Sequence, residues 1–514
     1  MKKVAVRVFS IALALVVFAA PRTQSQTLPL VATGTLDNTR GGNFADLSGL
    51  HYTLENGVPA NSLGGFGSAL AYASGNTFLA LPDRGPNAVT FDNSIDSTAS
   101  YVNRFHTITM NLQPNKNASG LPFTLTPEMR ATTLFWSLTP LVYGTGAGLG
   151  VGTGVPPINN FFQHFFTGRS DNFDPTQNSG DPKDARFDSE GMRVSNDGLR
   201  LYVSDEYGPY VYEFDRLTGV RLRSFQLPSS LFVTTLSSMG AVEIADNTKG
   251  RVANKGMEGL AITPDGKTLV GIVQNALTQD AADKSVKGTK NFLRIIVMDI
   301  KCGCTIHQYG YLLTNGSGVS EIVAVNDHQF LVDERDGNGR ESGGDDVTKG
   351  NAAVVKQLFL IDLNEATDIS GLDTGNMTMA QAMAGVAPKT LFLDVVASLT
   401  STTLGANAIP ATLIPAKLEG VAFGPDLKQE DCSPEFWGSF WSAHGKNGKE
   451  SSSDGNKAIH TIWIANDNDF LQMVVDPNGN QIPNPNQFFV FSFTDDDLPG
   501  FVQQKFQQAF PLFF

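Results

Sequence analysis

Acidic residues recur beside glycine at the start of short apolar segments in this chain. Glu190-Gly191, Glu258-Gly259 and Glu419-Gly420 each open such a segment, and Glu321 opens a similar one. Polar residues also follow the next apolar segment in each copy: Asp205 and Glu206, Gln274 and Asn275, Asp333 and Glu334, Asn466 and Asp467. Carboxylate and amide oxygens in such numbers can hold a hard cation such as Ca²⁺, and a carboxylate can serve as a general base.

Short antiparallel strands are the elements that must position these groups. The same order of apolar strand, turn and second strand recurs over residues 187–215, 257–300, 320–362 and 418–493, with a weaker copy over 47–87. The Asp-Gly pairs at 197–198 and 265–266 are typical hairpin turns, because glycine supplies the positive φ. In a hairpin the start of the first strand lies beside the end of the second, so Glu190 should lie near Asp205 and Glu206.

A repeated unit of three or four antiparallel strands predicts an all-β fold, a single β-propeller. Five visible copies, with residues 100–180 able to hide another, predict about six blades within a range of five to seven. Residues 28–36 are expected to pair with the C-terminal strands and close the ring. The propeller domain is therefore assigned to residues 28–514, with insertions near 137–186 and 427–460.

The N-terminus has the pattern of a secretory signal peptide, assigned to residues 1–25. Basic Lys2, Lys3 and Arg7 precede an apolar run over 8–20 that is too short for a comfortable membrane span. An uncleaved N-terminal helix is the alternative. We expect a secreted or periplasmic protein with no membrane insertion after cleavage. The net charge of -14 argues against nucleic acid as a partner, because nucleic-acid binding needs clustered Lys and Arg.

Three cysteines are too few for a disulfide scaffold. Cys302 and Cys304 are separated by one residue, which we interpret as too close for an unstrained bridge. Pairing of one of them with Cys432 is the alternative.

The repeated motifs resemble those of the phytase-like family described as having esterase-like activity of phytase. The residues that carry the resemblance are the three Glu-Gly pairs, the loop over 204–209 and the loop over 83–87. The resemblance covers roughly residues 40–495 and implies a β-propeller that hydrolyses a small-molecule ester or phosphoester. Propeller phytases carry an Asp-Ala-acidic-Asp-Pro-Ala run, which the segment 184–188 only echoes, so phytate is not the expected substrate.

Radial packing of the blades should bring the repeated polar groups to one face of the central channel. For a hydrolase, the candidate catalytic residues there are Glu190, Glu258 and Arg84, and the candidate substrate-binding residues are Arg84, Arg335 and Tyr207. The candidate ligands for Ca²⁺ are Asp83, Asp205, Glu206, Glu321, Asp333, Glu334, Asp336, Glu419 and Asp467. Glu334 and Asp336 of this set, together with Asn338 and Gly339 and with Asp345 further on, have the alternating spacing of a calcium loop.

Two alternatives stay open for the same residues. The ring of carboxylates could be architectural and cap backbone amides of neighbouring blades, which would make the chain a non-catalytic binding propeller. The reaction could also be hydrolysis of a lactone or carboxylic ester on the same fold. A serine hydrolase is not indicated, because the chain contains no Gly-x-Ser-x-Gly segment.

Overall fold

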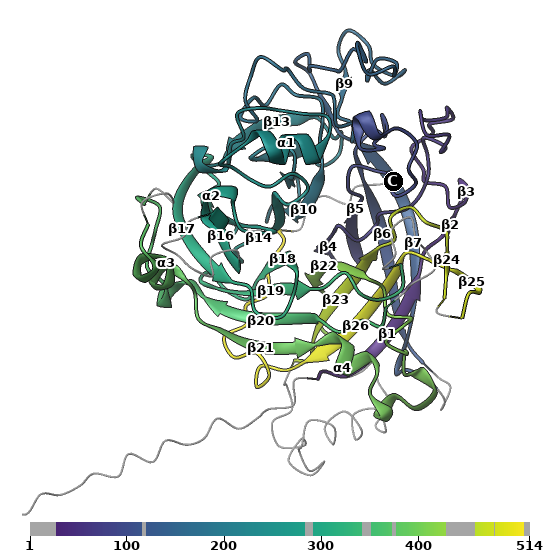
Figure 1. The fold of residues 1–514 in the computed structure, drawn as a ribbon. Helices are drawn as coiled ribbons and strands as arrows, with labels where there is room; N and C mark the ends of the chain where they lie inside the picture. The colour runs from purple at the N-terminus through teal and green to yellow at the C-terminus, as the bar shows by residue number, and fades with distance from the viewer. Residues whose placement is uncertain are drawn as a thin grey trace, which may run out of the picture.

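The protein is a β-propeller of five blades arranged radially around a central channel (Figure 1). The computed structural model describes residues 27–115, 120–282, 291–341, 351–372, 377–427, 458–476 and 478–507. Each blade is a four-stranded antiparallel sheet, and the innermost strands of neighbouring blades contact one another. Within the described ranges, no helix is long and apolar enough to cross a membrane.

The strands of the blades follow one another in chain order, from the channel outward. The first blade consists of β4 (Ala69–Ser74), β5 (Thr77–Leu81), β6 (Arg104–Pro114) and β7 (Phe123–Leu134). The second consists of β10 (Ser189–Val194), β11 (Arg200–Asp205), β12 (Tyr210–Asp215) and β13 (Arg221–Gln226). The third consists of β14 (Met257–Ile262), β15 (Thr268–Val273), β16 (Phe292–Asp299) and β17 (Cys304–Leu312). The fourth consists of β18 (Gly318–Ala324), β19 (Gln329–Arg335), β20 (Lys356–Asp362) and β21 (Lys389–Asp394).

The fifth blade joins the two ends of the chain. It consists of β22 (Lys417–Phe423), β23 (His460–Asp467), β26 (Gln487–Phe493) and the N-terminal strand β1 (Leu30–Thr35). Strand β1 pairs antiparallel with β26, which confirms the predicted closure of the ring. Because the outer strand of this blade comes from the other end of the chain, backbone hydrogen bonds between β1 and β26 close the ring.

Smaller elements decorate the blades. Three two-stranded sheets pair β2 (Asn38–Thr39) with β3 (Gly42–Asn43), β8 (Trp136–Ser137) with β9 (His164–Phe165), and β24 (Met473–Val475) with β25 (Gln481–Pro483). The α-helices are α1 (Gly240–Asp246), α2 (Thr278–Ala282), α3 (Met379–Gly385) and α4 (Val395–Leu399). Short 3₁₀ turns cover Asn93–Ile95, Ser229–Leu231, Leu363–Glu365 and Thr402–Asn407.

The predicted propeller is confirmed, and the blade count lies at the lower end of the predicted range. Residues 100–180 supply the long outer strands β6 and β7 of the first blade and then the small β8–β9 sheet, not a blade of their own. The insertion over 137–186 returns to the propeller, where Ser170 and Arg186 line a cavity discussed below. The signal-peptide residues 1–25 and most of the second insertion lie outside the described residues.

Hairpin turns and apolar packing explain why these segments form blades. Gly198 and Gly266 have φ of 74° and 73°, the left-handed conformation expected of the two Asp-Gly turns. Alternate side chains of each strand point into the space between blades and bury aromatic and branched residues there. Trp463 of β23, for example, is fully buried, with its ring 4.7 Å from that of Phe78 in the next blade.

Cys302 and Cys304 form a disulfide in the turn between β16 and β17. They were predicted to be too close for an unstrained bridge, yet the tight turn holds their Cα atoms 5.3 Å apart, within the normal range for a bridge. Cys432 lies outside the described residues.

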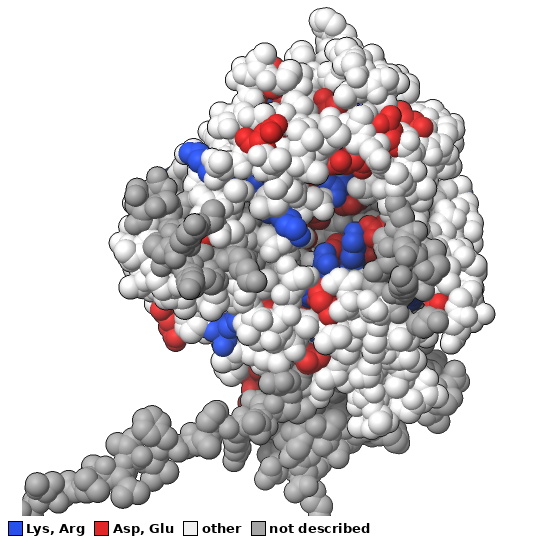
Figure 2. All heavy atoms as spheres, viewed as in Figure 1, with Lys and Arg blue, Asp and Glu red and all other residues white. Residues whose placement is uncertain are grey.

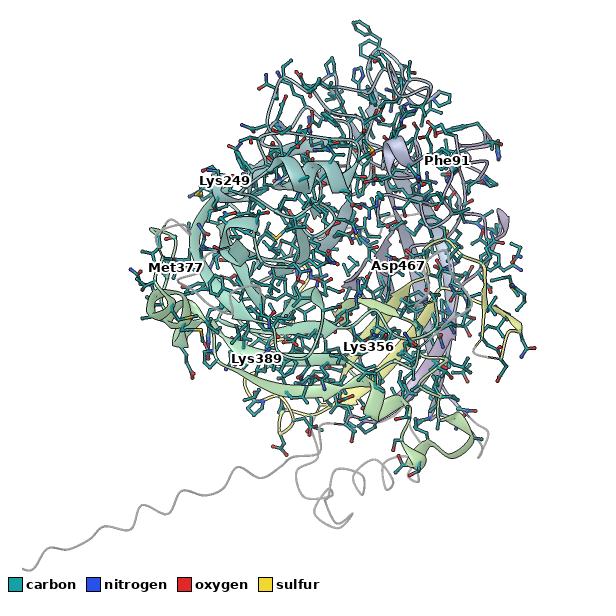
Figure 3. The ribbon with its side chains drawn as sticks, in the orientation of Figure 1. Phe91, Lys249, Lys356, Met377, Lys389 and Asp467 are labelled. Carbon is teal, nitrogen blue, oxygen red and sulfur yellow. A yellow bond between two sulfur atoms is a disulfide. The ribbon has the colours of Figure 1, made fainter. Side chains whose placement is uncertain are left out.

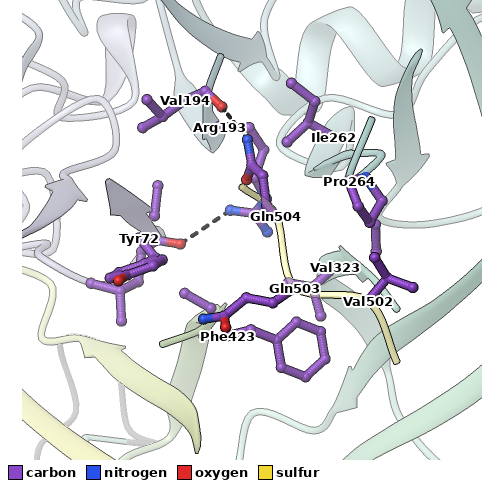
Figure 4. A pocket seen from close by; sticks show the side chains of 14 residues that line it. Tyr72, Arg193, Val194, Ile262, Pro264, Val323, Phe423, Val502, Gln503 and Gln504 are labelled. Atoms are coloured by element: carbon purple, nitrogen blue, oxygen red, sulfur yellow. Dashed lines mark hydrogen bonds between the residues drawn. The ribbon is translucent and has the colours of Figure 1, made fainter. Parts of the chain in front are cut away.

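A C-terminal strap, residues 502–504, crosses one end of the channel (Figure 4). The amide of Val502 donates to the Val325 carbonyl at 2.8 Å, and the Gln503 side chain donates to the Gly424 carbonyl at 2.7 Å. Gln504 Nε2 donates to the Val194 carbonyl at 2.8 Å. The strap therefore ties together the ends of β18, β22 and β10, which belong to three different blades.

Candidate functional site

The Glu-Gly pairs lie at irregularities of the innermost strands. The register between β10 and β11 shifts between Ser189 and Met192, and equivalent shifts occur at the Glu-Gly pairs of β14 and β22. A β-bulge of this kind leaves one residue unpaired and turns its side chain away from the regular alternation. The bulges therefore turn Glu190, Glu258 and Glu419 toward the channel.

Glycine follows each glutamate because the next blade approaches too closely for a side chain. A Cβ on Gly191 would lie 2.5 Å from the Leu260 amide nitrogen of β14, and one on Gly259 would lie 2.7 Å from the Ile322 nitrogen of β18. Any larger residue would push neighbouring inner strands apart. The repeated glycine is thus explained by packing, whereas the repeated glutamate needs a separate explanation.

Charged and polar side chains from all five blades converge at one end of the channel, which we call the charged end (Figure 2). They enclose a cavity of about 80 Å³. Its lining residues are Ser68, Asp83, Arg84, Glu190, Glu206, Asn254, Glu258, Gln274, Arg335, Lys417, Glu419 and Asp467. Eight of the residues predicted from the sequence are brought together here: Asp83, Arg84, Glu190, Glu206, Glu258, Arg335, Glu419 and Asp467.

Three carboxylates at the charged end have the arrangement of a cation site. Asp188, Glu190 and Glu206 are all buried, and one oxygen of each lies within 4.8 Å of the others. Asp188 and Glu190 flank the first residue of β10, and Glu206 follows β11, so a single hairpin holds all three. The Glu206 carboxylate is further fixed by the Gly256 amide, which donates to Oε1 at 3.0 Å. Such a set of oxygen donors suits a hard divalent cation.

Burial and neighbouring negative charges make the ionised forms of Glu190, Glu206 and Glu258 costly. Burial, and then the neighbouring Glu258 and Asp188 charges, hold the pKa of Glu190 well above its usual value. Burial, and then Glu206 and Glu419, do the same for the pKa of Glu258. Burial and the Asp188 charge raise the pKa of Glu206 to about 7. A cation bound among these groups would favour their ionised forms.

Three cationic side chains lie at the edges of this acidic cluster. Arg84 contacts Asp188 through Nη1 at 2.6 Å and also donates to the Asn254 side chain. Arg335 pairs with Glu419, and its Nε donates to the Ser320 hydroxyl at 2.6 Å. Lys417, which the sequence analysis did not select, contacts Asp467 at 2.9 Å. The charged end therefore offers positive groups next to the carboxylates, as recognition of an anionic ester requires.

Two of the predicted carboxylates lie at the channel but serve the fold. Asp205 accepts hydrogen bonds from the amides of Asp188 at 3.1 Å and Tyr207 at 3.0 Å, so it holds the turn after β11. Glu321 lies deeper, where its carboxylate is 2.9 Å from Arg193 Nη2 and accepts from the Leu260 amide at 3.0 Å. For these two residues the contacts are those of the architectural alternative.

Other predicted residues lie away from the charged-end cavity. Glu334 binds Lys389 and accepts from the Tyr311 hydroxyl at 2.6 Å, while Asp336 binds Lys356 at 2.6 Å. Figure 3 shows both lysines on the outer strands β20 and β21, whereas Asp467 lies near the centre. A lysine thus neutralises each of these two carboxylates.

Three further residues of the predicted set lie outside the charged-end cavity or outside the described residues. Asp333 is buried in β19, and Tyr207 lines a neighbouring cavity. Asp345 of the predicted calcium loop lies outside the described residues.

Asp188 is the functional candidate that sequence reasoning missed. It precedes the Ser189-Glu190 pair, but the equivalent positions before Glu258 and Glu419 carry Gly256 and Lys417. Because it does not recur from blade to blade, the repeat gave no signal for it. The local indication for Asp188 is its position two residues before Glu190, directly before β10 begins.

The fold and the charged end define a five-bladed propeller with a candidate cation and anion site at one mouth of its channel. The chain belongs to the phytase-like family, described as esterase-like activity of phytase, whose model matches residues 61–470. A relative from Arthroderma benhamiae, described as an uncharacterized secreted protein, is 32% identical over 181 residues. That match spans 30% of this chain and 35% of the relative.

Solved propellers resemble the chain only distantly. A protein from Lactobacillus plantarum matches with a TM-score of 0.29 and 9% identity, over 83% of this chain and 88% of that one. The Cps50 (Swd1) β-propeller domain of Myceliophteria thermophila matches with a TM-score of 0.22 and 10% identity, over 58% and 56% of the two chains. Likenesses of this size carry no information on function.

Proposed function

We propose that this chain is an exported hydrolase of phosphate or related esters that acts at the charged end with a bound divalent cation, Ca²⁺ by preference. The observation that carries the proposal is the juxtaposition of three carboxylates within 4.8 Å with the Arg84 guanidinium, which contacts one of them at 2.6 Å. The family description, which names esterase-like activity, supports the same reaction class.

Each residue of the cluster has a distinct role in this proposal. Asp188, Glu190 and Glu206 would hold the cation, which when bound polarises an ester oxygen and lowers the pKa of a water molecule. Arg84 would hold an anionic oxygen of the substrate through charge-assisted hydrogen bonds. Glu258, fixed by the Gln274 amide at 2.7 Å, would accept a proton from the attacking water.

Export is proposed on two grounds. The first 25 residues have the charge and apolar pattern of a signal peptide. The Arthroderma relative is described as a secreted protein. Calcium is abundant outside cells, where an oxygen site with millimolar affinity would be occupied.

The test is hydrolysis of 4-nitrophenyl phosphate and 4-nitrophenyl acetate by the purified mature protein, with added Ca²⁺ and with chelator. Release of nitrophenol from the phosphate that requires Ca²⁺ supports the proposal. Turnover of the acetate alone would instead favour the carboxylic-ester reaction on the same site. Absence of turnover of both by a folded, Ca²⁺-loaded protein would contradict a hydrolase and favour a binding propeller.

Thermal unfolding gives a readout of the cation that does not depend on activity. A ligand that binds only the folded chain raises the melting temperature as its concentration exceeds its Kd. We therefore expect Ca²⁺ to raise the melting temperature and chelator to lower it. An unchanged melting temperature up to about 10 mM Ca²⁺, roughly tenfold above the Kd of the weakest oxygen sites, would contradict the cation site.

A further inference from the structure

A second cavity of about 270 Å³ lies beside the charged end. Arg84 and Asn254 line both cavities, so the two are neighbours that share a wall. The remaining lining comes from four separate segments: the loops around residues 87–96, the 137–186 insertion, Tyr207 in the turn after β11, and residues 237–253 around α1. The roles assigned above to the charged end leave this larger space unexplained.

A buried arginine with spare hydrogen-bonding capacity lines this cavity. The Arg186 side chain is 3% exposed, and its Nη2 makes no hydrogen bond to any residue that the structure describes. Its Nη1 makes two long hydrogen bonds, to the Ser170 carbonyl at 3.4 Å and to the Ser237 carbonyl at 3.5 Å. A buried cationic donor without a partner is costly, so such a group indicates a ligand that supplies the missing acceptor.

The nearest carboxylate does not satisfy Arg186. Glu243 Oε2 is 3.7 Å from Arg186 Nη2, beyond hydrogen-bond distance. Glu243 already accepts from Arg251 Nη1 and from the Ser237 amide. Two buried arginines therefore share the Glu243 carboxylate, and Arg186 Nη2 is left without an acceptor within hydrogen-bond distance among the described residues, although the Asp184 and Asp205 carboxylates also interact electrostatically with Arg186. The other lining carboxylate, Asp96, is exposed and solvated.

Aromatic rings hold the two arginines of the cavity in place. The Arg186 guanidinium lies 4.6 Å from the Phe173 ring centroid and 5.1 Å from that of Tyr207. Arg84 lies 5.8 Å from the same Tyr207 ring. Tyr207 is itself anchored, because its hydroxyl donates to the Gly168 carbonyl at 3.0 Å. Cations fixed in this way lose little conformational entropy when they bind a planar or tetrahedral anion.

We propose that this cavity is a subsite for an anionic group, phosphate or carboxylate, on the part of the substrate that is not hydrolysed, with Arg186 as its main contact. The inference rests on the proposed function in one respect: the reacting ester is taken to lie in the adjacent cavity at the charged end. It narrows the substrate to esters that carry a second anionic group within reach of Arg186.

Calorimetric titration in chelator tests the subsite without requiring turnover. The probes are inorganic phosphate and acetate, added to the wild-type protein and to Arg186→Gln. Loss of a charge-assisted contact should weaken binding by about tenfold or more. Arg130→Gln is the matched control, because Arg130 pairs with Glu128 on the exposed surface and should bind both probes as the wild type does.

A second variant keeps the test decisive if Arg186→Gln does not fold. Ala253 lines the cavity without a charge, and Ala253→Leu should fill part of the space and weaken the same binding. Tighter binding of phosphate than acetate identifies a phosphate group as the ligand, and the reverse identifies a carboxylate. No binding of either probe, or equal binding by the wild type and the cavity variants, would overturn the subsite.

Kinetics separates this inference from the proposed function. For an active protein, Arg186→Gln should raise the KM for 4-carboxyphenyl phosphate by about tenfold and change that for phenyl phosphate little. If the protein is active and Arg186→Gln changes the KM for both substrates equally, the subsite is rejected and the proposed hydrolase function stands. Inactive protein that binds phosphate through Arg186 rejects the hydrolase and keeps the subsite.

Discussion

The two ends of the channel are built from the same five inner strands, yet they differ in almost every chemical respect. The strands begin at the charged end, where Glu190, Glu258 and Glu419 line the cavity. They finish at the strap end, where Val194, Ile262 and other mostly apolar residues meet residues 502–504 (Figure 4). One end concentrates buried carboxylates with raised pKa values, and the other fills its space with packing and amide hydrogen bonds.

Between the two ends, an ion pair spans the channel. Arg193 of β10 reaches across to Glu321 of β18, and its guanidinium also donates to the carbonyls of Leu70 at 3.1 Å and Ile322 at 2.9 Å. The carboxylate of Glu321 accepts from backbone amides of its own and the neighbouring blade. Contacts of this kind bind blades to one another. Glu321 has a cationic partner from another blade, whereas the charges that raise the pKa of Glu190 all belong to neighbouring carboxylates.

The largest expected effect is on activity at the charged end. Glu190→Gln should lower kcat/KM by about 10² to 10⁴-fold, the range over which an acid, base or ligand group of a site contributes. The melting temperature should stay the same or rise, because the substitution removes repulsion from buried neighbouring carboxylates. Initial rates and thermal unfolding measure the two quantities, and Glu128→Gln on the exposed surface is the control. A variant that unfolds early yet keeps its specific activity would place Glu190 with the structural carboxylates.

The next effect is on stability at the centre of the channel. At pH 8, above the pKa of Glu321, Arg193→Met should lower the free energy of unfolding by about 3–5 kcal/mol, because it leaves the ionised Glu321 carboxylate buried without its partner. The double variant Arg193→Met/Glu321→Leu should recover much of this loss, since apolar groups can replace a buried pair. Urea unfolding measures both, and activity per folded molecule should be retained. Equal losses in the single and double variants would show that the pair is not coupled.

Glu321 should also make the free energy of unfolding depend on pH. Burial raises its pKa to about 7 even though Arg193 opposes the shift. The folded chain therefore holds a proton that the unfolded chain releases, and the free energy of unfolding should fall as pH rises from about 4.5 to 7 and then level off. Glu321→Gln should remove up to about 1.4 kcal/mol per pH unit from this slope. Urea unfolding between pH 4.5 and 8 compares the two slopes, and identical slopes would refute the assignment.

The sequence was sufficient to predict the propeller because its hairpins are local. The Asp-Gly turns at 197–198 and 265–266 and the repeated Glu-Gly pairs each report a strand boundary without reference to the rest of the chain. The blade count was harder, because β6 and β7 belong to the first blade although 22 residues separate β5 from β6. Nothing in the spacing shows that this connection stays within one sheet.

For the candidate site, the sequence likewise predicted only contacts within a single hairpin. Pairing rules placed Glu190 beside the end of β11, and the register of Ser189 with Asp205 agrees with this. They could not show which carboxylates already have partners, because those partners lie far along the chain: Arg193 of the second blade for Glu321, and Lys389 of the outermost strand of the same blade for Glu334. The unpaired Nη2 of Arg186 was equally hidden, since the Glu243 and Arg251 side chains come near it only through the fold.

The smallest expected effect is at the strap end. Gln504 Nε2 donates to the Val194 carbonyl at 2.8 Å and to the Asn196 side chain at 2.7 Å, so Gln504→Ala should lower the free energy of unfolding by about 1–2 kcal/mol. Activity should be unchanged, because Arg193 and Glu321 separate the strap from the charged end. Urea unfolding and initial rates measure the two, with Gln113→Ala in the outer strand β6 as a control. A fall in kcat/KM without loss of stability would show that the two ends communicate, since the inner strands are the only elements that line both cavities among the described residues.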